Sequence, residues 1–315
     1  MGYNKFMNLK YINSRTDLAL ELHEELIDKD KANEKFEIGG VKVSVTQGDV
    51  KTTVVEILSE EGASKMGKPI GKYVTLEWLD NNEIVQIGGE TTDLERHLTR
   101  EFHSIIGNIG NEAAKKILVV CLGNRAITPD ALGPFTADYI TVSDNLKVIA
   151  PGVLGTTGIE TAQIVKAIAS KINPDLIIAV DALASRSVSR LNKTVQISNT
   201  GIKPGAGMGN LREEITEETM GVPVIAVGVP TVVDAATIAN ESLEKMLKDL
   251  ITYSDGSDFY KMIEALGEEN RYPLIKSLLE PYENMFVTPK EIDVVMKNLS
   301  VIIASAINEI NPFLE

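Results

Sequence analysis

Hydrophobic and polar residues follow two different patterns along this chain, and the pattern changes near residue 116. In the first part, apolar and polar residues alternate, which is typical of half-buried strands. Alternation predicts three strands, over 41–45, 52–58 and 73–78, and helical spacing predicts helices around 18–27 and over 93–107. We therefore expect a β-rich N-terminal portion, over about 36–110.

Short continuous apolar runs replace the alternation in the second part, and a helical pattern over 157–172 separates two of them. The runs occupy 117–122, 176–180 and 224–229. Runs of this kind are typical of parallel strands that are buried on both faces. Their alternation with helices predicts an α/β fold with three layers, α/β/α, around a mostly parallel or mixed central sheet. We expect this core to span about 115–250.

Mainly helical spacing follows Asp234 and predicts a helical C-terminal part, over about 255–315. The candidate helices occupy 235–250, 259–266, 272–279 and 289–310. Pro289 suits the first turn of the last helix, with Thr288 as its N-cap. The sequence contains no internal repeat, and we expect the three parts to form a single domain.

Three aspartates stand beyond the ends of the three apolar runs. Asp130 lies in the loop after the first run, Asp181 directly follows the second, and Asp234 follows the third. In an open α/β sheet, ligands bind beyond the carboxyl ends of the strands, and right-handed crossovers bring those ends to one edge. Each aspartate alone could instead cap the helix that follows it. Asp234 is interpreted mainly as such a cap.

Small apolar residues flank Asp130 and Asp181, which limits the water near them. Two partly buried carboxyl groups cannot both ionise at low cost, so the pair tends to share one proton. Such a pair suits general acid–base catalysis, because one carboxylate can activate a water while its protonated partner polarises a carbonyl. The two aspartates therefore predict a hydrolytic site.

Glycine-rich segments could line the same edge. In 151–160, backbone amides around Gly155 and Thr157 could bind a substrate carbonyl, although the start of a helix alone would explain them. The segment 205–210 could be a loop near the site or a plain connector. The segment 62–69 nearly spells a phosphate-binding loop, but Pro69 stands where Ser or Thr is needed, so we interpret it as a turn.

Composition narrows the possible functions. Acidic residues outnumber basic ones, 45 to 31, and the net charge of −14 disfavours direct nucleic-acid binding. The single cysteine, Cys121, cannot form an intrachain disulfide, and no apolar run is long enough to span a membrane. We therefore interpret the chain as a soluble cytoplasmic protein that has no membrane partner. The 3 histidines form no zinc motif, so we predict no metal and no other cofactor.

Several long motifs resemble signatures of the germination protease family, among them Ile-Thr-Pro-Asp-Ala-Leu-Gly-Pro at 127–134. The others lie at 151–161, 173–187, 196–198 with 201–209, 228–235 and 287–293. The resemblance covers nearly the whole chain from about Arg15 onwards. It implies a fold similar to that of hydrogenase-maturation proteases. It also implies an endopeptidase of an atypical aspartic type, whose two catalytic aspartates match Asp130 and Asp181.

The resemblance also implies a biological role. The family's enzymes degrade small acid-soluble spore proteins during germination, which implies a location in the forespore and spore core. They form homotetramers and are made as zymogens that remove a short propeptide by self-cleavage. They cut after an acidic residue, before an apolar residue and Ala, a pattern that Asp17-Leu18-Ala19 matches. We therefore expect a propeptide of 1–17, cleavage between Asp17 and Leu18, and a peptidase domain of 18–315.

Supporting residues and two alternatives stay open. Arg186 could orient a carboxylate or bind an acidic substrate side chain, or it could form a structural ion pair. With Gly155, Thr157 and Asp234 it completes the set of expected substrate-binding or supporting residues. The first alternative function is a metallopeptidase in which the same aspartates bind a metal. The second is a non-enzymatic α/β module that binds a small ligand through its glycine-rich loops.

Overall fold

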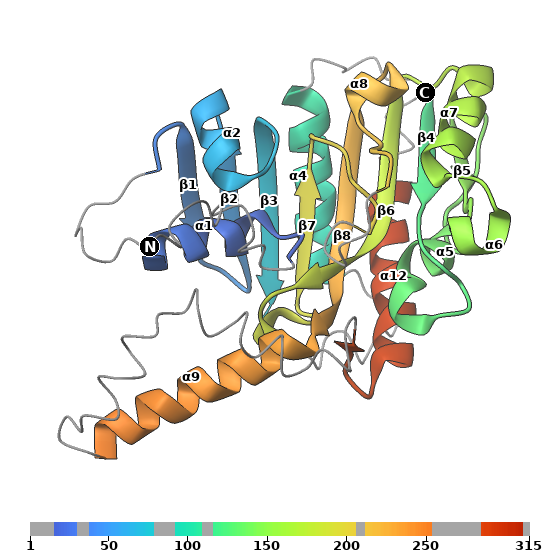
Figure 1. The fold of residues 1–315 in the computed structure, drawn as a ribbon. Coiled ribbons are helices and arrows are strands. Elements are labelled where there is room, and N and C mark those ends of the chain that lie inside the picture. Colours follow the sequence, from blue (N-terminus) through green and yellow to red (C-terminus); the bar gives the residue numbers. More distant parts are fainter. Residues whose placement is uncertain are drawn as a thin grey trace, which may run out of the picture.

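A computed structural model describes residues 16–29, 38–78, 92–108, 116–205, 212–253 and 285–310. Within these residues, nine strands form one sheet in the order β1-β2-β3-β7-β8-β6-β4-β5, and β9 pairs with β8 (Figure 1). The strands are β1 (Val41–Thr46), β2 (Val50–Ile57), β3 (Gly71–Trp78), β4 (Ile117–Cys121), β5 (Leu146–Ile149), β6 (Leu176–Ser185), β7 (Thr194–Ser198), β8 (Val224–Asp234) and β9 (Phe286–Val287).

The sheet is mixed. Strands β5, β4, β6 and β8 run parallel to one another, whereas β7 is antiparallel to both β8 and β3. The hairpin strands β1, β2 and β3 are antiparallel to one another. Because β3 pairs with β7, the β-rich N-terminal portion and the α/β core belong to one continuous sheet.

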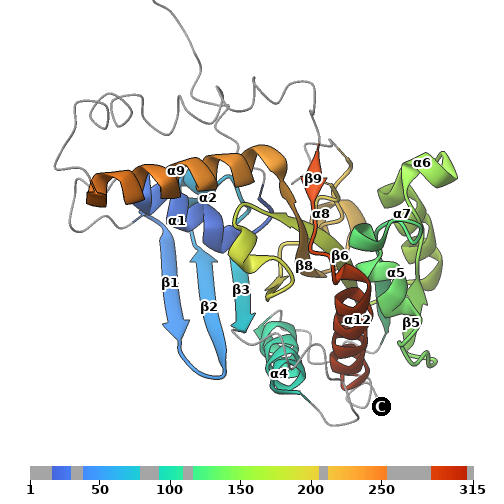
Figure 2. The same ribbon diagram turned by 90° about the horizontal axis from the view of Figure 1, so that it is seen from below.

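Helices cover both faces of the sheet, which gives the expected three layers (Figures 1 and 2). They are α1 (Ala19–Lys29), α2 (Glu60–Met66), α4 (Asp93–Asn108), α5 (Leu132–Ala137), α6 (Leu154–Thr157), α7 (Thr161–Ile172), α8 (Glu217–Met220), α9 (Ala235–Tyr253) and α12 (Ile292–Asn308), with short 3-10 turns η2 (Thr128–Asp130) and η3 (Val188–Arg190). Helices α4, α5 and α12 pack on one face, and α1, α2 and α7 pack on the other. Helix α9 leads away from the end of β8 (Figure 1).

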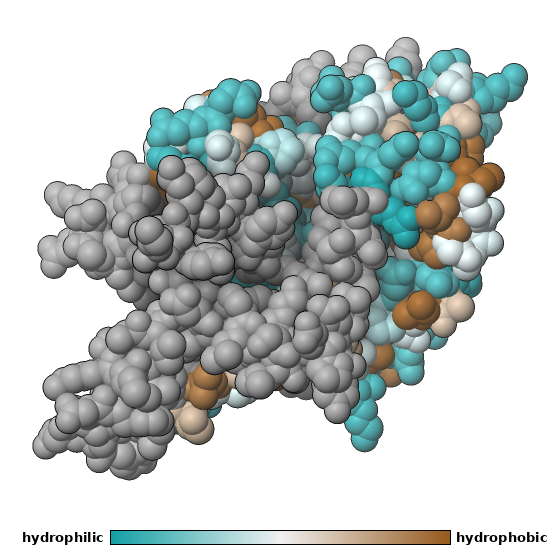
Figure 3. Space-filling model, in the orientation of Figure 1, coloured by the Kyte–Doolittle hydropathy of each residue, from teal (hydrophilic) through white to brown (hydrophobic). Residues whose placement is uncertain are grey.

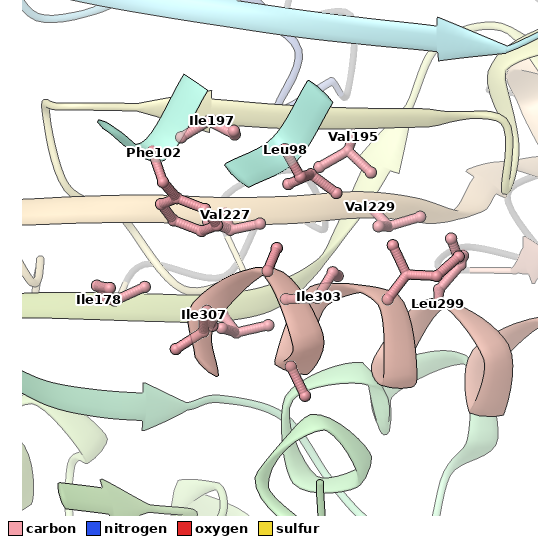
Figure 4. Close-up of a cluster of buried hydrophobic side chains, with 14 of the residues drawn as sticks. Leu98, Phe102, Ile178, Val195, Ile197, Val227, Val229, Leu299, Ile303 and Ile307 are labelled. Carbon is pink, nitrogen blue, oxygen red and sulfur yellow. The ribbon is translucent and has the colours of Figure 1, made fainter. Parts of the chain in front are cut away.

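The main core lies under α4 and α12 (Figure 4). Leu299, Ile303 and Ile307 of α12 repeat every four residues, so they form one stripe that faces the sheet, and all three are fully buried. Phe102 of α4 and Val227 of β8 meet this stripe from the other elements of the cluster. Burying each side chain of this size stabilises the fold by roughly 1.5–3 kcal/mol.

Local signals explain where the structure differs from the predicted elements. The helix predicted over 157–172 corresponds to α7, which starts only at Thr161, because the short helix α6 before it ends at Gly158 with a positive φ of 71°. The last helix starts at Ile292 rather than at residue 289, and the hydroxyl of Thr288 donates to the carbonyl of Thr231 instead of capping it. The segment predicted as a turn over 62–69 is mostly helix α2, which Gly67 ends.

Two of the predicted strands are longer than their apolar runs, because β6 and β8 pair with each other beyond the point where β4 ends. Strands β5, β7 and β9 were not predicted. The helices predicted over 259–266 and 272–279 lie outside the described residues.

Exposed hydrophobic residues are scattered over the described surface. In the view of Figure 3, they lie in small groups between hydrophilic residues, which is ordinary for a protein surface. Among the described helices, none combines the length and the apolar character that a membrane crossing requires.

Candidate active site

The loop after β4 and the second half of β6 bring Asp130 and Asp181 to one cavity of about 480 Å³. Strand β4 ends at Cys121, which lies opposite Val180, so Asp181 is the first residue of β6 beyond that pairing. The loop returns to the same place through η2, which ends at Asp130. The rule that parallel strands present their ends at one edge thus predicted this convergence correctly for two aspartates.

A close contact fixes the loop that carries Asp130. Gly133, in the first turn of α5, packs so tightly against the end of β4 that a Cβ there would lie 2.2 Å from the carbonyl oxygen of Leu122. The backbone N–H of Asn124 donates to Asp130 Oδ2 at 2.9 Å. The position of this carboxyl group is therefore set by backbone packing on both sides.

The two carboxyl groups have different proton affinities. Burial raises the pKa of Asp130 to about 6, and the hydrogen bond from Asn124 opposes that rise. Burial raises the pKa of Asp181 well above its ordinary value, and the charges of Asp130 and Asp17 raise it further. The hydrogen bond from the Ala182 N–H to Asp181 Oδ1, at 2.9 Å, opposes this shift. Burial thus favours the protonated form of both carboxyl groups, and the negative charge of Asp130 favours a proton on Asp181.

The segment around Asp17 lies in the same cavity, on the open edge of β6. The N–H of Asp17 donates to the carbonyl of Ala184 at 3.0 Å, and the N–H of Ala184 donates to Asp17 Oδ2 at 2.9 Å. Asp17 is therefore held against β6 by one bond from its backbone and one to its side chain. The predicted cleavage bond, Asp17–Leu18, therefore begins at a residue that lines the cavity together with the two aspartates.

Two side chains bind the carbonyl oxygen of Asp17. Lys68 Nζ donates to it at 3.0 Å, and Gln196 Nε2 donates to it at 3.2 Å. Burial lowers the pKa of Lys68, and the charge of Asp17 opposes that effect. Leu18, which follows, is fully buried.

Buried carboxylates hold α1 in place after this segment. Glu21 accepts hydrogen bonds from the backbone N–H groups of Arg186 and Ser187, at 2.7 and 3.1 Å. Arg190 binds Glu24 with two bonds of 2.7 Å and Glu77 of β3 at 3.0 Å. The helix is thereby tied both to the end of β6 and to the hairpin strands.

The expected role of Arg186 is not supported by its position. Its guanidinium pairs with Glu25 of α1 at 3.2 Å, and it is absent from the described lining of the cavity. The structure thus places Arg186 in the structural ion pair that was the other interpretation. The physical reason is that the carboxylates of α1 pack against the residues that follow β6.

Of the other expected supporting residues, some line the cavity and some do not. Gly155 lines the cavity. Thr157 does not, and its hydroxyl bonds to the carbonyl groups of Val153 and Ile159 within its own loop. Asp234 accepts from the N–H of Ala236 at 2.8 Å and so caps the start of α9, as its sequence position indicated.

Sequence reasoning missed three residues of this region. Arg212 is the only Lys or Arg among the described residues that line the cavity, and it lies 3.6 Å from Glu160 in an ion pair. Lys68 stands in the segment that was interpreted as a plain turn. Gln196 lies within one of the motifs that carry the family resemblance, and that was the only signal for it.

Comparisons with known proteins give a consistent result. The family model described as germination protease matches residues 19–255. A germination protease of Clostridium perfringens is 46% identical over 313 residues and covers 94% of each chain. One of Caldanaerobacter subterraneus subsp. tengcongensis is 45% identical and covers 93% of each chain.

Among solved structures, the hydrogenase maturation protease HycI of Thermococcus kodakarensis matches with a TM-score of 0.27 and 15% identity. That match covers 53% of this chain and 91% of HycI. HybD of E. coli, a hydrogenase maturating endopeptidase, matches with a TM-score of 0.26 and 18% identity, over 44% of this chain and 94% of HybD.

Proposed function

Because this chain belongs to the germination protease family, we propose that it is a zymogen endopeptidase that uses Asp130 and Asp181 to cut after acidic residues. Membership itself makes it a protease of spore germination. The proposed substrates are small acid-soluble spore proteins, the proposed assembly is a homotetramer, and the proposed location is the forespore and spore core. The observation that carries the proposal is the cavity that Asp17, Asp130 and Asp181 line together.

The proposed reaction uses the unequal proton affinities of the two carboxyl groups. Asp130, ionised above about pH 6, takes a proton from water while the water oxygen attacks the carbonyl carbon of the bond to be cut. Asp181 keeps its proton and donates a hydrogen bond to the carbonyl oxygen, where negative charge develops. Asp130 then passes the proton it gained to the departing amine nitrogen. Both carboxyl groups end in their starting states, and one water has been consumed.

The bond Asp17–Leu18 is the proposed site of self-processing. Asp17 is already hydrogen-bonded to Ala184 of β6, and it lines the same cavity as the proposed catalytic pair. Removal of 1–17 would leave Leu18 as the new N-terminus. The same edge of β6 would then receive a peptide of a protein substrate.

Two groups explain the proposed preference for an acidic residue before the cut. The Ala184 N–H donates to the carboxylate of Asp17, and a charge-assisted bond of this kind is stronger than a neutral one. Arg212, which is paired with Glu160 in the cavity wall, is the second group, and a substrate carboxylate would share its positive charge. Both favour a carboxylate over a neutral side chain at this position.

Self-cleavage of the purified full chain tests the proposal. Incubation at about pH 6 should produce a new N-terminus at Leu18, identified by N-terminal sequencing and intact mass. Asp130→Asn and Asp181→Asn should each slow this cleavage by at least about 10³-fold, which is typical for the loss of a catalytic residue. Asp144→Asn, which changes an exposed aspartate before β5, is the matched control. Normal cleavage in either of the first two variants would show that the assignment is wrong.

A chelator separates this mechanism from the metallopeptidase alternative. Within the described residues, no group of three or more His, Cys, Asp or Glu side chains is arranged to hold a metal ion. Self-cleavage should therefore proceed at an unchanged rate after exhaustive treatment with a strong chelator. Loss of activity that a divalent metal restores would favour the alternative.

A further inference from the structure

The side chain of Gln196 spans the bond that is proposed to be cut. Its Nε2 donates to the carbonyl of Asp17 at 3.2 Å, and its Oε1 accepts from the N–H of Ala19 at 2.8 Å. One planar amide thus binds the backbone on both sides of the Asp17–Leu18 bond. Because it contacts only backbone atoms there, it would serve any substrate sequence equally.

The sheet register explains why Gln196 is in this position. Gln196 of β7 lies opposite Gly228 of β8, and Gly228 lies opposite Asp181 of β6. Residues paired in this way point to the same face, and two strand spacings separate the outer pair by about 10 Å. Asp181 and Gln196 therefore stand on either side of a residue without a side chain.

The glycine in the middle leaves space for the side chain of Leu183. A Cβ at Gly228 would lie 2.5 Å from Cγ of Leu183, a residue that lines the cavity with Asp181 and Asp17. Asp17, Gln196 and Gly228 also line a second cavity, of about 230 Å³. The register of the row Asp181–Gly228–Gln196 thus places the carboxyl group of Asp181 and the amide of Gln196 on the same face of the sheet.

The two hydrogen bonds of Gln196 should act at different stages. The bond to the N–H of Ala19 is present before and during the reaction, so it contributes to binding. The bond to the carbonyl oxygen of Asp17 strengthens as negative charge develops there, so it contributes to rate. Lys68 Nζ, at 3.0 Å from the same oxygen, is a second donor to this charge.

From this geometry we propose that Gln196 is the substrate-backbone clamp of the peptidase, in self-processing and in cleavage of protein substrates. It binds the carbonyl before the cut and the N–H of the second residue after it. The proposal rests on the proposed function, because it takes Asp17–Leu18 as the bond that is hydrolysed. It adds a residue that contacts the reacting carbonyl and that lies outside the aspartate pair.

A double-substitution cycle in the full chain tests the clamp. Gln196→Met removes both hydrogen bonds at similar volume. Replacement of Ala19 by lactic acid, through nonsense suppression, turns its N–H into an ester oxygen and removes only the donor to Oε1. The first-order rate of cleavage at Asp17–Leu18 is measured by intact mass, which distinguishes it from hydrolysis of the new ester. Gln163→Met, which changes an exposed glutamine of α7, is the matched control.

We expect Gln196→Met to slow cleavage by about 100-fold, as removal of one donor to a developing oxyanion does. The ester should slow the unsubstituted chain by about 10-fold, the effect of losing one hydrogen bond. It should have almost no effect in the Gln196→Met background, because the acceptor is already gone. The rate of the Gln163→Met chain should be unchanged.

The possible failures are distinguishable. If the ester slows both backgrounds equally, or slows neither, the clamp is refuted while the aspartate mechanism stands. If the unsubstituted chain leaves Asp17–Leu18 intact, the proposed function fails and the clamp fails with it. The effect of the ester is also measured in a chain that keeps Gln196. A refutation obtained in that chain therefore holds even if the Gln196→Met chain misfolds.

Discussion

The charge of Asp130 raises the pKa of Asp181 across the cavity that both residues line. Burial is the larger cause, since the Asp181 residue is only 5% exposed. Asp130 is less buried, and its pKa rises only to about 6. The surroundings of the two carboxyl groups therefore differ before any substrate reacts, and the proposed mechanism gives Asp130 the role of base and Asp181 that of acid. Each role has consequences that can be measured.

The rate of cleavage should depend on pH through Asp130. Because its pKa is about 6, the ionised form that accepts the proton is lost below that value, and kcat should fall about tenfold for each pH unit. Initial rates of peptide cleavage from about pH 4.5 to pH 8 would show this acidic limb. A rate that stays constant between about pH 4.5 and pH 7 would contradict the role of Asp130 as base.

Stability should depend on pH in the opposite sense. The folded pKa of Asp130 lies above its ordinary value of 3.8, so the folded chain binds more protons than the unfolded chain between about pH 4 and pH 6. The free energy of unfolding therefore falls as pH rises through this window. Asp130→Asn removes the effect and should raise that free energy at pH 7.5 by about 1 to 3 kcal/mol. Urea unfolding at pH 4 should show little of this gain, and an equal gain at both pH values would contradict the explanation.

Arg190 should be the strongest single anchor of α1. Its side chain is 13% exposed and its guanidinium binds Glu24, Glu77 and Glu21, so Arg190→Met removes the positive charge that three carboxylates share. We expect a loss of about 3 to 5 kcal/mol in the free energy of unfolding, measured with urea. Arg125→Met, which breaks an exposed pair with Asp138, should cost no more than about 1 kcal/mol. Equal losses in the two variants would contradict the anchoring role.

Gly133 should be essential for the position of Asp130. A Cβ at Gly133 would meet both the carbonyl oxygen and the nitrogen of Leu122, at 2.2 and 2.5 Å. Gly133→Ala should therefore destabilise the fold by at least about 2 kcal/mol and reduce self-cleavage. Gly107→Ala, in α4, meets nothing within 4 Å and should leave activity unchanged and stability equal or up to about 1 kcal/mol higher. Normal activity and stability of the Gly133→Ala chain would show that the loop can shift.

The meeting of Asp130 and Asp181 could be predicted from sequence, because apolar runs identify buried parallel strands and the ends of such strands share an edge. The place of Gln196 could not, because it depends on which strands flank β7. The antiparallel insertion of β7 between β3 and β8 is a long-range pairing that leaves no local pattern. Lys68 was missed for a similar reason, since the packing of α2 brings it to the site.

The sequence around Arg186 and Arg190 also could not show which carboxylates each arginine binds. Both arginines follow β6 within five residues, and both have the same chemistry. Their partners come from α1, more than 150 positions earlier in the chain. Arg186 pairs with Glu25, and Arg190 pairs with Glu24, which is 166 positions away in the sequence. A residue type predicts an ion pair, but only the fold selects the partner.

The pairing of Asp17 with Ala184 joins the proposed scissile bond and the proposed catalytic pair within one molecule. Maturation by this route would follow first-order kinetics, with a half-life that dilution leaves untouched. Each chain would mature at a rate set by its own active site, and the fraction of mature enzyme at a given time would not depend on the protein concentration.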